Sequence, residues 1–190
     1  SVGSEVQKGT NALPKGSYLS PGAVGFLAAM GIKTIPVIPR PRVAIIVTGN
    51  ELLPIGAPLK YGMVYDSNSH TLLAAFRQLG DFDCTIQQVH DSAEHLQEVL
   101  VKAIDAHDLV LLTGGVSVGD YDHVVSAANS AGVRKIFHKV RQKPGKPIFF
   151  GMKGTKPVFG LPGNPASVLT CFYQYVTIAL SRLTEFGYTL

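Results

Sequence analysis

A glycine-rich segment over residues 113–122 carries the residue types that bind phosphate or another oxyanion. It reads Thr-Gly-Gly-Val-Ser-Val-Gly-Asp-Tyr-Asp, with an aliphatic run before it and a helical pattern after it. Gly114, Gly115 and Gly119 let the backbone approach an anion, and free N–H groups at a helix start attract negative charge. Ser117 belongs to the same candidate loop. A tight strand-to-helix turn needs similar glycines, so a generic glycine pattern leaves both interpretations about equally open.

Carboxylates follow three of the expected strands, at Glu51, Asp91 and Asp122. Because the carboxyl ends of parallel strands meet at one edge of a sheet, these acids could together bind a divalent cation or order a water molecule. The alternative is helix capping, since Asp91 and Glu94 have the spacing of a capping box and Asp122 precedes a helix. Convergence of all three acids on one edge supports a chemical role, and capping stays open at this point.

Two lysines, Lys143 and Lys146, flank a Pro-Gly turn. They belong to a group of six cations within residues 134–146, a stretch that contains no acid. Lysine runs are usually solvated surface, but the Pro-Gly spacing would hold two ammonium groups in a fixed relation. Such a pair suits a small polyanion. The stretch lacks the interleaved exposed aromatics of a single-strand nucleic-acid binder, so we expect no nucleic-acid partner.

The segment Gly-Leu-Pro-Gly-Asn-Pro at residues 160–165 predicts the start of the last helix. Asn164 has the position of an N-cap, and Pro165 has the first helical position. Pro162 and Pro165 would also keep this loop rigid, so that the helix start and the Ser167 hydroxyl could face an oxyanion.

Composition indicates a folded protein, with 46% hydrophobic and 16% charged residues among 190. The net charge is +4, and the basic stretch accounts for more than all of it. Cys84 and Cys171 lie far apart without metal-ligand spacing, so we expect buried, reduced thiols. No charged and apolar leader opens the chain, and the apolar run at 168–180 is too short to span a bilayer. A cytoplasmic protein with no membrane partner is expected.

From residue 42 onward, β-branched runs alternate with helical patterns, which is typical of βαβ units and a parallel sheet. The expected strands are 43–48, 85–90, 109–113, 135–140, 148–150 and 157–160, and the expected helices are 69–79, 93–107, 123–131 and 165–183. Residues 1–40 contain many prolines and glycines, with a helix expected over 23–30, between the Ser20-Pro21 start and Gly31, and a strand over 34–38. We therefore predict a three-layer α/β domain with a mainly parallel sheet over 41–190, preceded by a small appendage.

The full string at 113–122 resembles the signature of the MoeA family, the bacterial counterparts of the gephyrin E domain and the plant molybdenum insertases. The segments Lys-Pro-Gly-Lys-Pro at 143–147 and Gly-Leu-Pro-Gly-Asn-Pro at 160–165 agree in type and order, and 48–52 is similar to the family's first strand and loop. The resemblance covers residues 2–183. It implies the molybdopterin-binding fold shared with MoaB and MogA proteins, with residues 1–40 similar to the returning part of domain I.

The resemblance further implies insertion of molybdate into adenylated molybdopterin with release of AMP, by a homodimer that uses Mg²⁺. It assigns the pterin phosphate region to residues 114–119, molybdate to Lys143, Lys146 and Ser167, and Mg²⁺ or a water molecule to the three acids. Asp66 and Asn68 precede a helix and have the usual position of caps, but the resemblance places them near the pterin pocket. Because domain IV and much of domains I and II are not matched, we expect this chain alone to bind ligand but to insert molybdate poorly.

Two other functions stay open at this point. A gephyrin-like scaffold would bind a receptor segment, although the groove for it in that family needs domain IV. A CinA-like domain would process a nucleotide, although Val-Ser-Val-Gly and the Lys-Pro-Gly-Lys turn favour MoeA. Binding of AMP or molybdopterin would separate the first alternative from the enzyme, and turnover of nicotinamide mononucleotide would reveal the second.

Overall fold

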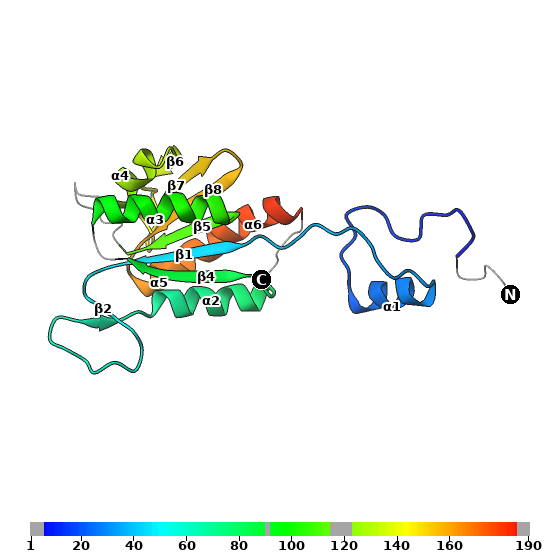
Figure 1. Cartoon of the computed structure of the whole chain (residues 1–190), viewed down its shortest axis with the longest axis horizontal. Helices are drawn as coiled ribbons and strands as arrows, with labels where there is room; N and C mark the ends of the chain where they lie inside the picture. The colour runs from blue at the N-terminus through cyan, green and yellow to red at the C-terminus, as the bar shows by residue number, and fades with distance from the viewer. Residues whose placement is uncertain (1–5, 90–91, 115–122, 186–190) are drawn as a thin grey trace. The chain divides into compact units, whose positions relative to one another are not determined.

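The computed structural model describes residues 6–89, 92–114 and 123–185, and it divides into two units, Ser1–Pro39 and Arg40–Leu190. In the first unit, helix α1 spans Pro21–Ala29 (Figure 1). Its start is capped as expected, because the Ala23 N–H donates to Ser20 Oγ at 3.2 Å and Pro21 needs no partner for a missing N–H. Gly31 follows with a φ of 75°, which a residue with a Cβ rarely adopts.

The strand expected over 34–38 is wrong. Residues 32–42 form no strand, and the side chains of 32–40 are exposed. Pro36 and Pro39 interrupt this stretch and have no N–H to donate to a neighbouring strand. The β-branched residues gave the pattern of a strand, but the prolines remove the hydrogen bonds that would hold one.

The second unit is built on a six-stranded sheet in the order β4-β1-β5-β8-β7-β6 (Figure 1). The strands are β1 Val43–Thr48, β4 Cys84–Val89, β5 Leu109–Thr113, β6 Arg134–His138, β7 Phe149–Lys153 and β8 Lys156–Leu161. Strands β4, β1, β5 and β8 are mutually parallel, whereas β7 is antiparallel to both β8 and β6. The prediction of a mainly parallel sheet is confirmed.

Helices cover both faces of this sheet, which confirms the three-layer architecture. Helices α3 (Ala93–Ala106) and α4 (His123–Ser130) pack on one face, against alternate strand residues such as Ala44 and Ile46. On the other face, against Val43 and Ile45, lie α2 (Asn68–Leu79), α5 (Pro165–Cys171), a π-helical turn η1 (Phe172–Val176) and α6 (Thr177–Thr184). Strand β1 is buried along its whole length because side chains on both of its faces enter a core.

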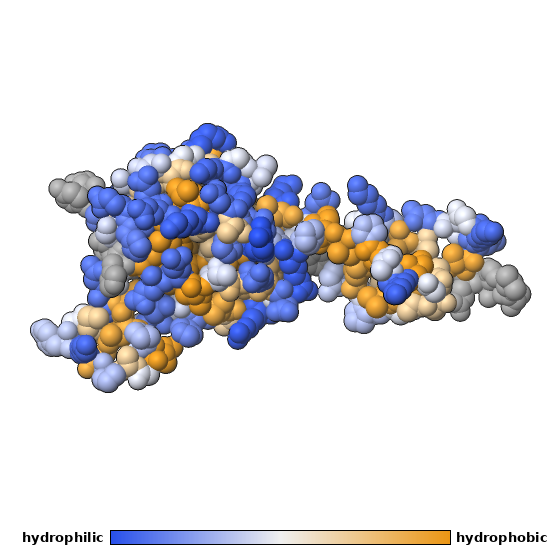
Figure 2. Space-filling model, viewed as in Figure 1, coloured by the Kyte–Doolittle hydropathy of each residue, from blue (hydrophilic) through white to orange (hydrophobic). Residues whose placement is uncertain are grey.

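Two local features depart from the sequence prediction. Helix α3 is capped by Ser92 instead of Asp91, since Ser92 Oγ accepts from the His95 N–H and donates to Glu94 Oε2 at 3.0 Å. The short strands β2 (Leu52–Leu53) and β3 (Val64–Tyr65) pair in parallel within a stretch for which no strand was predicted. The segment between them exposes apolar side chains (Figure 2). Among the described ranges, no helix is long and apolar enough to cross a membrane.

Candidate functional site

Three central strands end side by side, and the loops that follow them form the candidate site. Val47 of β1 lies opposite Thr113 of β5, and Thr113 lies opposite Leu161 of β8. The loops that begin at Gly49, Gly114 and Pro162 therefore leave the same edge of the sheet, which we call the carboxyl edge. Polar residues gather at such an edge because the hydrogen-bonded strands hold the loops rigidly in place.

Gly114 lies so close to the end of β1 that only glycine fits. A Cβ on this residue would lie 2.1 Å from Thr48 O, and its φ is +83°. Gly163 approaches from β8, and a Cβ built there would lie 3.9 Å from the Gly114 Cα. The loops after β1, β5 and β8 are thus in mutual contact at Gly114.

The Asn68 side chain connects the start of α2 to two of these loops. Its Nδ2 donates to Thr113 Oγ1 and to Gly163 O, both at 2.9 Å. Asp66 performs the capping role expected of this segment, because its Oδ1 accepts from the Ser69 N–H at 3.1 Å and its Oδ2 from the Ser69 hydroxyl. Asn68 is therefore a bridge at the carboxyl edge and not a helix cap.

Two buried polar atoms at this edge have unused hydrogen-bonding capacity. Within the described part of the chain, Thr48 Oγ1 and Asn68 Oδ1 have no hydrogen-bond partner. A buried polar group without a partner costs free energy, so proteins retain few of them, and those retained often belong to binding sites. One unsatisfied hydroxyl beside Gly114 and one unsatisfied carbonyl of Asn68, which bonds to Thr113 and Gly163, are what a site for a polar ligand would contain.

We expect Asn68→Ala to destabilise the protein by about 1–3 kcal/mol, because it removes two hydrogen bonds and leaves the hydroxyl of Thr113, a buried residue, with fewer partners. Urea denaturation followed by circular dichroism measures the change. Asn129→Ala, on the exposed side of α4, is the matched control and should shift stability by less than about 0.5 kcal/mol. Equal effects for the two variants would contradict the bridging role.

The carboxylates predicted to act together are only partly described. Glu51 is exposed, and its carboxylate lies near Gly49, at 2.9 Å from where a Cβ would be. Asp91 and Asp122 lie outside the described residues, as do Gly115, Ser117 and Gly119. No group of three or more His, Cys, Asp or Glu that could hold a metal occurs among the residues whose placement is described.

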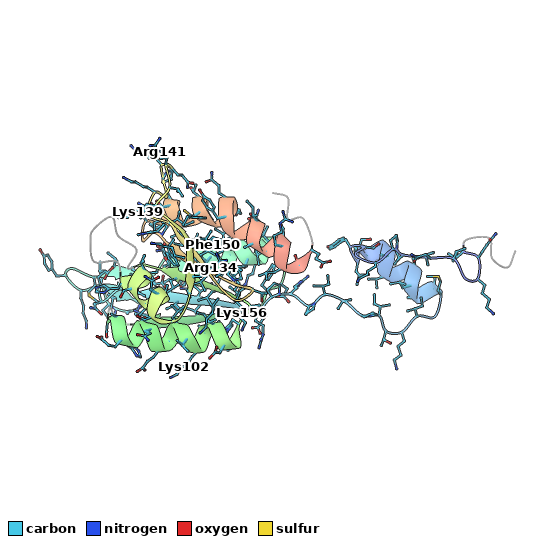
Figure 3. All side chains as sticks on the ribbon, turned by 90° about the horizontal axis from the view of Figure 1, so that it is seen from above. Lys102, Arg134, Lys139, Arg141, Phe150 and Lys156 are labelled. Carbon is cyan, nitrogen blue, oxygen red and sulfur yellow. The ribbon has the colours of Figure 1, made fainter. Side chains whose placement is uncertain are left out.

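Lys143 and Lys146, with Pro144 and Gly145 between them, form a turn that we call the lysine turn, which belongs to the hairpin between β6 and β7. Strand β6 runs in the same direction as β8, because β7 is antiparallel to both, so the hairpin also leaves the carboxyl edge. Its backbone is closed by the Val140 N–H donating to Lys146 O at 2.9 Å, and Lys143 and Lys146 are both exposed. The Lys143-Pro144 peptide bond is cis. Figure 3 shows Lys139 and Arg141 projecting from this hairpin, so the basic stretch is solvated as well as clustered.

The loop at 162–165 has the predicted capping. Asn164 is the N-cap of α5, its Oδ1 accepting from the Ser167 N–H at 3.2 Å, and Pro165 is the first helical residue. The Ser167 hydroxyl, predicted to face an oxyanion, is buried and lies 3.5 Å from the same Asn164 oxygen. Pro162 is buried behind this turn.

Burial is the main cause of a raised pKa in both cysteine thiols. It raises the pKa of Cys171 to about 11, partly offset by the Gln142 side chain. Burial and the Asp83 carboxylate raise the pKa of Cys84 to about 11, with Arg77 opposing them. Both are therefore protonated at neutral pH. Cys171 is fully buried, whereas Cys84, expected to be buried, is partly exposed because β4 is at the edge of the sheet.

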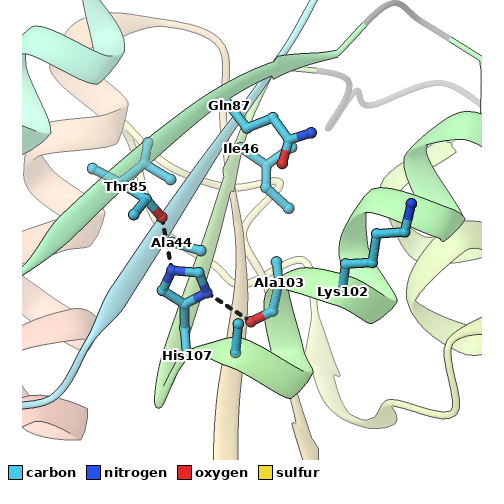
Figure 4. A pocket seen from close by; sticks show the side chains of 9 residues that line it. Ala44, Ile46, Thr85, Gln87, Lys102, Ala103 and His107 are labelled. Atoms are coloured by element: carbon cyan, nitrogen blue, oxygen red, sulfur yellow. Dashed lines mark hydrogen bonds between the residues drawn. The ribbon is translucent and has the colours of Figure 1, made fainter.

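A pocket between β1, β4 and α3 lies apart from the predicted residues (Figure 4). Its wall includes Ala44, Ile46 and Lys102, and its one ring, His107, is held by Thr85 Oγ1 at 2.8 Å and Ala103 O at 2.9 Å. With both ring nitrogens engaged, His107 has a structural role here.

Sequence reasoning missed Thr48 and Thr113 as residues of the site. Each ends a strand and is followed by glycine, and the repeated Thr-Gly after aliphatic runs was the available signal. Both are buried, with 1% and 0% of their surfaces exposed, which is unusual for a polar residue at a strand end.

The sequence of this chain is similar to those of known proteins. The family profile described as "Probable molybdopterin binding domain" matches residues 44–182. The chain is 39% identical over 180 residues to the molybdopterin molybdenumtransferase of Nostoc sp., covering 93% of this chain and 41% of that protein. It is 37% identical to the Staphylococcus epidermidis protein of the same name, covering 95% and 43%. The chain thus spans less than half the length of these relatives.

Solved structures agree as well. A molybdopterin biosynthesis moeA protein from Pyrococcus horikoshii has a TM-score of 0.73 and 32% identity, covering 97% of this chain and 44% of that one. MoaB from Thermus thermophilus has a TM-score of 0.55 and 18% identity, covering 78% of this chain and 99% of that one. CinA from Thermoplasma acidophilum has a TM-score of 0.56 and 16% identity, covering 73% of this chain and 97% of that one. At this low identity, the two structures show a shared fold alone. The chain therefore belongs to the molybdopterin-binding domain family.

Proposed function

We propose that this chain binds adenylated molybdopterin and molybdate and takes part in molybdate insertion with release of AMP. The observation that carries the proposal is the meeting of Gly114, Asn68 and Gly163 at the carboxyl edge, beside buried polar atoms with unused hydrogen-bonding capacity. The names of the relatives support the choice of ligand, since they are molybdopterin molybdenumtransferases.

Both ligands are anions, so joining them requires neutralised charge and a fixed orientation. We assign the pterin phosphate region to the loop that begins at Gly114, where the backbone approaches without a side chain. Asn68, bonded to Gly163 and Thr113, keeps the neighbouring loops in register. Lys143 and Lys146, on a hairpin that leaves the same edge, neutralise molybdate.

Mg²⁺ belongs to the proposal through Glu51, Asp91 and Asp122, whose carboxylates would bind it or position the water that cleaves the bond to AMP. Of these three acids, only Glu51 lies among the residues that the structure describes, and it is exposed. One exposed carboxylate is not enough to bind Mg²⁺. A homodimer and a cytoplasmic location are further parts of the proposal, and they rest on the family resemblance.

The test is a titration of molybdate and of AMP against single lysine variants at fixed ionic strength. Lys143→Ala or Lys146→Ala should weaken molybdate binding by about 1–3 kcal/mol, the scale of a lost charge-assisted hydrogen bond. AMP binding should change little. Lys135→Ala is the control, because Lys135 is exposed at the start of β6, opposite Gly151 and away from the turn.

The ionic strength is held constant because exposed charges are screened over about 8–10 Å. If Lys135→Ala and Lys143→Ala weaken molybdate binding equally, the basic stretch acts as a diffuse field and the assignment of molybdate to the turn is wrong. If AMP does not bind at all, the assignment of the Gly114 loop is wrong.

A further inference from the structure

Two side chains outside the sequence motifs described above, Gln142 and Tyr175, form hydrogen bonds that support the backbone of the lysine turn. Gln142 Nε2 donates to Pro144 O at 2.7 Å, across the turn. Tyr175, in the π-helical turn η1, donates its hydroxyl to Gln142 Oε1 at 2.6 Å. A chain of hydrogen bonds therefore runs from η1 through Gln142 to the backbone between the two lysines.

The lysine turn also packs closely against the last helix. Gly145 is buried over Cys171, and a Cβ on it would lie 2.6 Å from Gln142 Nε2 and 2.7 Å from Cys171 Sγ. The Gly145 φ of +104° also requires glycine. The Tyr175 ring contacts Phe137 of β6, with centroids 5.9 Å apart, so Tyr175 touches both the hairpin's strand and its turn.

Tyr173 and Tyr175 are two residues apart in the same helical turn, so their side chains point in different directions. Tyr173 Oη donates to Gln78 of α2 at 2.9 Å, whereas Tyr175 Oη reaches the hairpin. A π turn widens a helix locally and redirects side chains, and such turns are frequent at functional sites. Tyr173 therefore serves as a matched control for Tyr175, since it has the same chemistry on the same turn but a different partner.

We propose that Tyr175 and Gln142 are positioning residues that hold the Lys143–Lys146 turn in the geometry that binds an oxyanion. The inference rests on the proposed function, in which this turn binds molybdate. Lysine side chains are flexible, so a fixed backbone beneath them is what distinguishes an oxyanion site from a solvated charge run. The two residues need not contact the ligand, because they act through the backbone of the turn.

The experiment compares Tyr175→Phe with Tyr173→Phe in the full chain. Removing the Tyr175 hydroxyl should weaken molybdate binding about three- to tenfold, the scale of one hydrogen bond to a neutral partner. It removes no charge, so the dependence of molybdate binding on salt should keep the wild-type slope, whereas Lys143→Ala should reduce that slope. Tyr173→Phe should leave molybdate binding unchanged. Thermal unfolding of both tyrosine variants checks that each remains folded.

A second readout reports the turn itself. Cys171 lies under Gly145 and is buried, so iodoacetamide reaches it only when the hairpin opens. Tyr175→Phe should raise the alkylation rate of Cys171 relative to Cys84, an internal reference in the same chain, as measured by mass spectrometry of the two peptides. Tyr173→Phe should not.

The outcomes separate the inference from the proposed function. Faster Cys171 alkylation with weaker molybdate binding in Tyr175→Phe alone supports the inference. Faster alkylation with unchanged molybdate affinity, or no change in either, overturns it while Lys143→Ala still tests the function. If Lys143→Ala leaves molybdate binding unaffected, the proposed function of the turn is wrong, and the inference fails with it, whatever the alkylation rates.

Discussion

Replacing Gly114 with alanine is expected to lower the free energy of unfolding by about 3 kcal/mol and to abolish AMP binding. The new Cβ would lie 2.1 Å from Thr48 O, a backbone atom of a central strand that cannot move away, and φ is +83°. Strain and steric overlap therefore act together at the point where the three loops meet. Urea denaturation measures the first effect, and calorimetric titration of AMP measures the second.

Gly163→Ala is the matched control for this variant. Gly163 belongs to the same group of loops, but it is exposed and a Cβ there would have one ordinary contact, at 3.9 Å. Its stability should stay within about 0.5 kcal/mol of the wild type. A Gly114→Ala protein that unfolds at the wild-type urea concentration and binds AMP normally would show that the described contact does not shape the site.

Truncating Phe172 should have an effect of similar or larger size, about 3–5 kcal/mol, through loss of core packing. Phe172 is fully buried, and its ring packs edge-on against Phe76 of α2 with centroids 5.0 Å apart. Phe172→Ala would leave a cavity between α2 and the π-helical turn. Denaturation with urea measures the loss, and an unchanged slope with denaturant shows that the folded state keeps its extent of burial.

Ile178→Ala on α6 is the control for the cavity, because Ile178 is also an apolar residue of the last helix but is 59% exposed. Its effect should stay below about 0.5 kcal/mol. A loss as large as that of Phe172→Ala would mean that Ile178 is covered in solution. A small loss in Phe172→Ala would mean that the surrounding helices close over the cavity.

Strong local signals let the sequence predict the central strands closely. Strands β1 and β5 have the predicted bounds, since continuous aliphatic runs that are buried on both faces leave little choice of structure. The N-caps at Ser20 and Asn164 were also predictable, because each precedes a proline at the first helical position. These features depend on neighbours in sequence.

The contacts that define the candidate site could not be predicted in this way. Asn68 bonds to partners 45 and 95 residues away, and Tyr175 to one 33 residues away, so each depends on which loops the sheet order brings together. At the start of α3, the sequence pattern indicated a cap at Asp91, whereas the N-cap of the helix is the adjacent Ser92. Sequence spacing cannot choose between adjacent residues when both side chains can accept the same hydrogen bond.

The π-helical turn at Phe172–Val176 has a consequence for insertions and deletions in this family. Deleting one residue there would leave a regular α-helix, in which each residue turns by about 100°. Because a π turn accommodates one extra residue and leaves the helix on either side in register, the residues after the deletion, including the buried Leu180, would still face the core. A deletion within residues 54–62, where no side chain is buried, would move none of the core. Relatives are therefore expected to vary in length between β2 and β3, and a relative that lacks one residue within 172–176 is expected to have a regular α-helix there.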